Sequence, residues 1–154
     1  MGKKKLEKLN ISSYKNIINK GLKWLIASGI QNSNKNKKNY GAFNAWFNIK
    51  NNKYSYLYSE ISGYLITFMI YQYQITKKKI YLKSAEKSAN WLIDRAQDEM
   101  GGIRCLFLID KQLKYQKKES LVYSFDNGVI ITGLINLYKI TKSKRYLNAA
   151  IKSA

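Results

Sequence analysis

The chain has 154 residues, enough for one domain with a hydrophobic core, and its 45% hydrophobic and 14% aromatic content indicates a folded protein. It has no histidine and one cysteine, Cys105, which excludes Ser-His-Asp and Cys-His nucleophiles, histidine-ligated zinc and an internal disulfide. Its formal net charge is +19, which normally indicates a polyanionic partner.

The positive charge is mostly lysine. Only three of the 28 basic residues are arginine (Arg95, Arg104 and Arg145), although phosphate-reading sites favour arginine for its bidentate fork. Lysine, asparagine, isoleucine and tyrosine are all abundant, and their codons are rich in A and T. Biased coding therefore explains much of the charge, and we do not expect nucleic acid as a partner.

Residues 1–12 form a basic leader, and the folded domain is predicted to span residues 13–154. Residues 1–12 are not followed by an apolar stretch of the kind found in signal peptides. The most apolar segment, residues 61–75, is shorter than the roughly 20 residues that span a bilayer. We therefore expect no membrane span and a cytoplasmic location, which the single cysteine also suits.

Helical spacing of apolar residues predicts five helices, with two short β-hairpins in the long connections. Trp24 and Trp91 fall on the apolar stripes and are expected in the core, and Cys105 is expected to be an inert buried thiol. The hairpins are predicted to turn at 51–52 and 110–111. The helices are predicted at 13–28, 59–76, 80–97, 124–142 and 144–154, and the hairpins within 41–58 and 101–123.

An internal repeat is the strongest signal in the chain. Residues 58–89 and 123–154 align without gaps, and more than half of the aligned positions are identical. Each copy reads as a well-buried inner helix followed by an amphipathic outer helix. The chain ends where the second copy is still incomplete, after about two and a half hairpins. We therefore expect a piece of a longer ring, whose open edge meets further hairpins of the same chain or a second copy.

Two details of each repeat carry structural predictions. Thr76 and Thr141 precede the inner-to-outer turns, where their hydroxyls are suited to cap a helix. Gly63 and Gly128 occupy matching positions near the start of the inner helices. We expect both glycines to let neighbouring inner helices approach closely.

The repeat resembles the hairpin signature of the (α/α) toroids, which include six-hairpin glycosidases, sugar 2-epimerases and glucuronyl hydrolases. The matching residues run from Ile75-Thr76 through Tyr81-Leu82 and Lys87-Ser88-Ala89 to Trp91-Leu92, Gln97 and Gly101-Gly102. The resemblance covers almost the whole chain. It implies an all-α fold of repeated helical hairpins, part of an (α/α) toroid.

The starts of the inner helices resemble a bacterial toroid domain associated with surface-polysaccharide biosynthesis. They read Glu60-Ile-Ser-Gly63-Tyr64 and Phe125-Asp126-Asn127-Gly128, and Val129 departs from the glutamine of that pattern. This resemblance implies a carbohydrate-active domain that acts on or binds a bacterial polysaccharide or its precursor, with glycoside hydrolysis as one such activity.

In such toroids the active cleft lies where the inner helices begin, so Glu60 and Asp126 are the candidate catalytic carboxylates, with Glu60 the favoured acid/base. The two are offset by one position in the repeat. A structural interpretation stands beside this one, because an acidic residue in a first helical turn also stabilises the helix dipole.

Residues near these carboxylates are candidate substrate contacts. Tyr58 and Tyr123 precede the inner helices and are suited to bind sugar hydroxyls, and Arg104 to bind an acidic sugar or phosphate. Aromatic rings of the long loops match the apolar faces of sugars, and the candidates are Phe43, Trp46, Phe47 and Phe107.

Three other functions stay open at this point. A non-catalytic helical-repeat module that binds a glycan or a protein partner is the main alternative. A nucleic-acid-binding protein has only the charge in its favour. A terpenoid-cyclase-like toroid fits the fold class but lacks the aspartate-rich motifs of that group.

Overall fold

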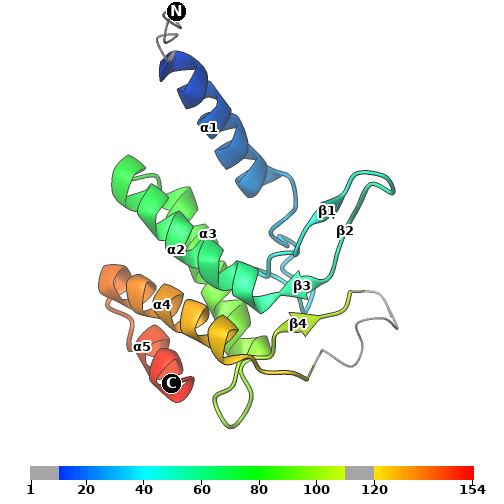
Figure 1. The fold of residues 1–154 in the computed structure, drawn as a ribbon. Helices are drawn as coiled ribbons and strands as arrows, with labels where there is room; N and C mark the ends of the chain where they lie inside the picture. The colour runs from blue at the N-terminus through cyan, green and yellow to red at the C-terminus, as the bar shows by residue number, and fades with distance from the viewer. Residues whose placement is uncertain (1–10, 110–119) are drawn as a thin grey trace, which may run out of the picture.

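The computed structural model describes residues 11–109 and 120–154, and these residues form two packed helical hairpins with a strand-containing end (Figure 1). The elements in chain order are α1 (Ile11–Ala27), β1 (Phe47–Asn48), β2 (Lys53–Tyr54), β3 (Leu57–Tyr58), α2 (Ser59–Thr76), α3 (Lys79–Trp91), the π-helix η1 (Leu92–Ala96), β4 (Leu106–Phe107), α4 (Ser124–Thr141) and α5 (Lys144–Lys152). The predicted helices are confirmed, and their ends differ from the prediction by one or two residues, except that a π-helix continues α3.

The inner helices α2 and α4 pack side by side and begin at the same end of the molecule (Figure 1). Helix α3 packs on α2, and α5 packs on α4, so the predicted pair of hairpins is confirmed. The two inner helices are apolar around most of their circumference because both faces are covered. Their fully buried apolar side chains are Ile66, Met69, Ile130, Leu134 and Leu137.

Two glycines allow the close approach of α2 and α4. A Cβ atom on Gly63 would lie 2.9 Å from Ile130 Cγ1, and one on Gly133 would lie 2.9 Å from the Gly63 carbonyl oxygen. The expectation for Gly63 is confirmed. The expectation for Gly128 is wrong, because no described atom lies within 4 Å of a Cβ built there. Gly133, five residues further along α4, faces α2 instead.

The turns from inner to outer helix have the same structure in both repeats. Thr76 Oγ1 donates to the Gln72 carbonyl oxygen at 2.7 Å and accepts from the Lys78 amide at 3.3 Å. Thr141 makes the equivalent bonds, so both hydroxyls stabilise the turns. The predicted helix-capping role is wrong, because the N-caps of the outer helices are Lys78 and Ser143 and make no side-chain capping bond. Lys77 and Lys142 follow with φ of 57° and 59°, the left-handed conformation that usually ends a helix on glycine.

The opposite end of the molecule carries the strands. β1 and β2 pair as the predicted first hairpin. The second hairpin is not found among the described residues, because β4 pairs with β3 from the preceding loop, in the register Leu57↔Phe107 and Tyr58↔Leu106. The turn predicted at 110–111 lies outside the described residues. The pairing of β3 with β4 joins the two long loops at the start of α2.

Buried amides fix the long loops to the outer helix of the following hairpin. Gln31 Nε2 donates to the carbonyl oxygens of Gly41 and Ser84 at 3.0 and 2.9 Å. In the next loop Gln97 Nε2 donates to the carbonyl oxygens of Gly101 and Ala149 at 3.3 and 3.0 Å. The loops therefore repeat in structure as well as in sequence.

Helix α1 stands away from the two hairpins (Figure 1). Leu22 is buried, but Trp24 is 45% exposed, so its predicted place in the core is wrong. Trp91, its counterpart in the repeat, is 3% exposed as expected. The difference arises because α3 packs on α2, whereas α1 has no such extensive helix contact within the described residues. No helix of the described residues has both the length and the apolar character to cross a membrane.

Candidate active site

Glu60 and Asp126 lie in the first turns of neighbouring helices, Glu60 in α2 and Asp126 in α4. Because α2 and α4 pack side by side and begin at the same end (Figure 1), their first turns lie near one another, and the charge of Glu60 acts on Asp126. The partly positive helix ends also favour negative charge, typically by about 0.3–1 kcal/mol. The dipole accounts for acidic residues in both first turns, but not for the environment of Asp126.

Asp126 is buried, with 3% of its surface exposed. Burial, and secondly the negative charge of Glu60, raise the pKa of Asp126 to about 6. Among the described residues, no group hydrogen-bonds to its Oδ2 atom. A carboxyl that only stabilised a helix end would instead remain solvated or accept backbone N–H bonds. Asp126 is therefore a carboxyl group that the fold places in an unfavourable environment for its charge.

Tyr58 connects the second carboxyl group to the strand end of the molecule. It is the last residue of β3 and directly precedes α2. Its pKa is raised by burial first and then by the hydrogen bond that its hydroxyl donates to Glu60, with a further contribution from the charge of Asp126. Tyr58, Glu60 and Asp126 thus form one electrostatically coupled cluster.

A row of aromatic rings leads from the surface to this cluster. The Trp46 and Tyr56 rings meet edge to face with centroids 4.9 Å apart, and Tyr56 meets Tyr58 at 6.2 Å. Trp46 is 45% exposed, so it offers ring surface to a ligand. Tyr56 is absent from the sequence-based candidates. The alternation of tyrosine along residues 54–58 is the signal for it, since alternate residues of a strand share a face.

The other residues predicted to contact a sugar differ in their exposure and in what they pack against. Phe43 is fully buried, so its proposed contact with a sugar is wrong, since its ring fills the core beneath the loop. Phe47 packs on Tyr54 across the β1–β2 hairpin, with centroids 5.0 Å apart. Tyr123 is 42% exposed, and its carbonyl oxygen accepts a bond from Asn127 Nδ2. Neither Tyr123 nor Tyr58 makes a side-chain capping bond to its helix.

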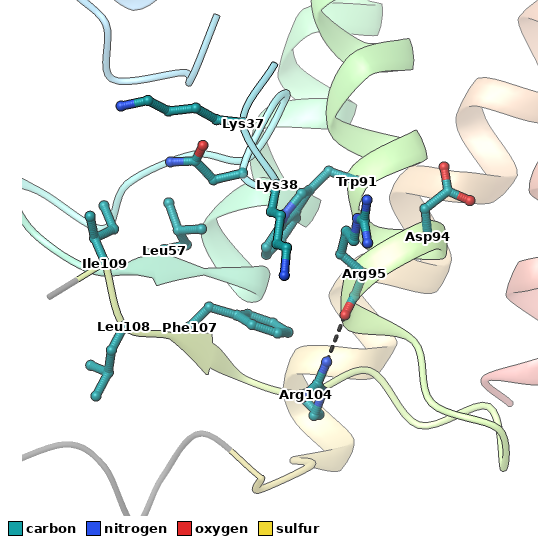
Figure 2. Close-up of a pocket in the computed structure, with 11 residues that line it drawn as sticks. Lys37, Lys38, Leu57, Trp91, Asp94, Arg95, Arg104, Phe107, Leu108 and Ile109 are labelled. Atoms are coloured by element: carbon teal, nitrogen blue, oxygen red, sulfur yellow. Dashed lines mark hydrogen bonds between the residues drawn. The ribbon is translucent and has the colours of Figure 1, made fainter. Parts of the chain in front are cut away.

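Arg104 and Phe107 lie in a separate pocket (Figure 2). The Arg104 guanidinium lies over the Phe107 ring at 4.5 Å, and Phe107 meets Trp91 edge to face at 5.2 Å. The residues that line this pocket include neither Glu60 nor Asp126. The structure therefore brings Tyr58 and Trp46 toward the carboxylates and places Arg104 and Phe107 elsewhere.

One amide outside the candidate set holds the loop between η1 and α4 in place. Asn127 Oδ1 accepts from the Ile103 amide at 3.0 Å, and its Nδ2 donates to the carbonyl oxygens of Ile103 and Tyr123. The Ser59 hydroxyl and amide bind the carbonyl oxygens of Arg104 and Cys105 at 2.6 and 2.8 Å. These bonds fix this loop to both inner-helix starts.

Comparison with known proteins agrees with this arrangement. Glycosyl hydrolase family 76 matches residues 35–154. Among solved structures, the chain is similar to the α-1,6-mannanase GH76A of Salegentibacter sp. HEL1_6, an inactive variant with two consecutive aspartates replaced by asparagine, in complex with α-1,6-mannotriose. The TM-score is 0.69 at 20% identity, and the match covers 94% of this chain and 40% of the mannanase.

At this identity the structural likeness establishes the fold, part of a six-hairpin (α/α) toroid, and the expected fold class is confirmed. The chain spans about 40% of the length of the mannanase. No significant match is found among curated protein sequences. Since the family match covers most of the residues, this chain belongs to glycosyl hydrolase family 76.

Proposed function

We propose that this domain takes part in the hydrolysis of an α-linked, mannan-type glycan, with Asp126 and Glu60 as the catalytic carboxyl groups. The observation that carries the proposal is the buried Asp126, whose pKa is raised to about 6 beside Glu60 at the loop end of the inner helices. Perturbed carboxyl groups of this kind gather at catalytic sites. Membership of a glycosyl hydrolase family supports the same reaction class.

Glycoside hydrolysis uses one carboxyl group to protonate the leaving oxygen and a second to activate water or attack the sugar. With a pKa of about 6, Asp126 keeps its proton at mildly acidic pH and serves as the acid. Glu60 accepts the Tyr58 hydrogen bond, which orients it as the base or nucleophile. This assignment reverses the sequence-based preference for Glu60 as the acid/base.

The aromatic row supports a sugar as the ligand. Trp46, Tyr56 and Tyr58 give an edge-to-face series that ends at Glu60, and aromatic faces match the apolar faces of pyranose rings. The mannanase with the same fold was solved with α-1,6-mannotriose. We therefore take α-1,6-linked mannan as the first substrate to test.

The test is turnover of α-1,6-mannan by Asp126→Asn and Glu60→Gln, with melting temperature measured on the same samples. Each change is expected to lower turnover by about 100-fold or more while the fold is kept, because acid or base catalysis contributes about 10²–10⁴. Glu99→Gln removes an exposed carboxylate and serves as the control. Unchanged turnover in both variants would contradict the catalytic roles.

A non-catalytic glycan-binding module is the second candidate, and one observation favours it. The mannanase was inactivated by replacing two consecutive aspartates. No two aspartates are consecutive in these 154 residues, and Asp126 is followed by Asn127. Binding of mannotriose with no turnover by the unaltered protein would support this candidate. It would leave the carboxylates as ligand-orienting groups.

The remaining proposals concern the source of the glycan, the cellular location and the binding partners of this domain. The inner-helix starts resemble a domain linked to surface-polysaccharide biosynthesis, which supports a bacterial polysaccharide or its precursor as the glycan and the cytoplasm as the place. Exposed apolar side chains on α1 and α2, including Ile17, Ile18, Tyr64 and Tyr71, support contact with further hairpins or a second copy. Sedimentation at several concentrations tests self-association.

A further inference from the structure

The pocket between the two long loops and the end of α3 has no part in the proposed hydrolysis (Figure 2). Its volume is about 650 Å³, within the usual range for a small-molecule site. Leu57, Leu108 and Ile109 give it an apolar side, and Trp91 and Phe107 also line it. Its remaining lining residues are Lys37, Lys38, Asn39, Asp94, Arg95 and Arg104.

The pocket concentrates positive charge. Among the residues that the structure describes, four cations line it against one acid, Asp94, and that carboxylate is bound at 2.6 Å by Arg145. An adjoining hollow that shares five of these residues adds Lys35 and Lys87. Burial and the charge of Lys35 lower the pKa of Lys87, as expected where cations crowd together.

The general excess of lysine does not explain this pocket. Arginine is rare in the chain, yet Arg95 and Arg104, two of the three arginines, line it, and the third binds Asp94. Two other grooves, one between α2 and α4 and one between α1 and α2, are lined without any cation. The cations are therefore placed here selectively.

The Arg104 side chain is held in position before any ligand binds. Arg104 Nη2 donates to the Arg95 carbonyl oxygen at 2.7 Å, and the guanidinium plane is packed on Phe107 (Figure 2). Within the described residues this is the one hydrogen bond that the guanidinium makes. A guanidinium has five N–H donors in a fixed fork, which suits bidentate binding of an anion.

We propose that this basic pocket, defined by Lys37, Lys38, Arg95 and Arg104 above Phe107, binds the phosphate group of a phosphorylated sugar. A phosphate dianion has enough charge and acceptor oxygens for several cations, whereas one carboxylate satisfies fewer of them. The apolar side formed by Leu57, Leu108 and Ile109 is suited to sugar carbons. The choice of a sugar rests on the proposed glycan function, while the phosphate rests on the pocket itself.

The proposed site is distinct from the carboxylates. Leu57 and Phe107 face each other across the β3–β4 pair, and both line the pocket. Tyr58 follows Leu57 in the same strand, so its side chain points to the opposite face, toward Glu60. The strand pair thus separates phosphate binding from the proposed hydrolytic site.

The test is calorimetric titration of the protein with mannose 6-phosphate, mannose, inorganic phosphate and a single-stranded DNA oligonucleotide. We expect mannose 6-phosphate to bind, inorganic phosphate to bind several-fold more weakly, and mannose to show no binding at the same concentration. Arg104→Gln is expected to raise the Kd for mannose 6-phosphate at least about tenfold, since bonds between charged groups contribute about 1.5–3 kcal/mol.

Three further variants serve as comparisons for Arg104→Gln. Arg104→Lys keeps the charge but not the fork, and an intermediate rise in Kd is expected. Lys139→Gln, an exposed lysine of α4, is the matched control and should leave the Kd within about twofold. Asp126→Asn should bind normally, so a failure of the proposed hydrolysis does not affect this result. Melting curves verify that each variant is folded.

Three outcomes would overturn the proposal. Equal Kd values for the unaltered protein and Arg104→Gln would exclude the pocket as the site. Equal affinity for inorganic phosphate and mannose 6-phosphate would exclude a sugar as the ligand. Tighter binding of DNA, with a steep dependence on salt and the same loss in Arg104→Gln, would assign the pocket to nucleic acid.

Discussion

The two ends of the repeated hairpins differ in how closely the copies match. At the turn end, Thr76-Lys77 and Thr141-Lys142 adopt the same backbone and make the same hydrogen bonds. At the loop end, one copy places the partly exposed Glu60 at its start, and the other places the buried Asp126 one position later. Repetition thus maintains the scaffold at one end, while the other end has diverged around a pair of carboxyl groups.

The divergence is a matter of register as well as residue type. Glu60 corresponds in the repeat to Phe125, which is 65% exposed, and Asp126 corresponds to Ile61. One step along a helix rotates a side chain by about 100°, which turns the carboxyl of Asp126 away from the solvent-facing position of Phe125. A one-residue offset therefore gives the two carboxyls different burial.

The largest expected effect on stability concerns the buried carboxyl. The pKa of Asp126 rises from an ordinary value of 3.8 to about 6 in the folded protein, so folding binds protons between these values. The contribution of protonated Asp126 to the free energy of unfolding is fully present below pH 3.8 and is lost as the pH rises through about 6. A shift of this size corresponds to about 3 kcal/mol at most.

Urea unfolding at pH 4 and pH 7 measures this contribution. The free energy of unfolding of the unaltered protein should fall toward pH 7 relative to Asp126→Asn, in which this dependence is gone. Glu99→Gln, which removes an exposed carboxylate, should keep the dependence. An identical pH profile of unfolding in Asp126→Asn would show that burial does not raise the pKa of the Asp126 carboxyl.

A second comparison uses the matching glycines Gly63 and Gly128. Gly63→Ala should destabilise the protein by about 1–3 kcal/mol, because the new methyl group overlaps Ile130 of the neighbouring helix. Gly128→Ala should stabilise it by about 0.5–1 kcal/mol, since alanine is the better helix former where no described atom is close. Thermal unfolding of both variants checks this, and equal shifts would contradict the packing of α2 on α4.

The smallest effect on stability is expected at the turn end, where the two repeats share the same backbone geometry. Lys77→Gly and Lys142→Gly should each stabilise the protein by about 0.5–1 kcal/mol, because glycine adopts the left-handed conformation without strain. The two gains should be equal and additive if the turns are equivalent. Unequal shifts in chemical denaturation would show that the two turns differ more than their hydrogen bonds indicate.

Much of the fold was predictable from sequence because repetition supplies a second copy of each signal. Helix bounds, the first β-hairpin and the adjacent inner helices were predicted correctly. The β3–β4 pairing was not, since residues 57 and 106 are distant in sequence and each strand has only two residues. Trp24 was misplaced because its apolar stripe has the same pattern as that of Trp91, and only tertiary packing separates them.

The site was predictable only in part. The positions of Glu60 and Asp126 followed from the helix starts, but their different burial depends on helix rotation and on the loops above them. Arg104 was proposed as a contact for an acidic sugar or phosphate, but Tyr56 and the other cations of the basic pocket were missed, because they depend on which loop residues meet. Phe43 was assigned to the surface, although it lies fully inside the core.

The most direct test of the coupled carboxyl pair is an NMR titration of the Asp126 side-chain carboxyl, in the unaltered protein and in Glu60→Gln. We predict a pKa of about 6 in the unaltered protein, and a lower pKa in Glu60→Gln, since the charge of Glu60 is the second cause of the rise. An Asp126 pKa at its ordinary value of 3.8, or one that Glu60→Gln leaves unchanged, would contradict the coupling of the two carboxyl groups.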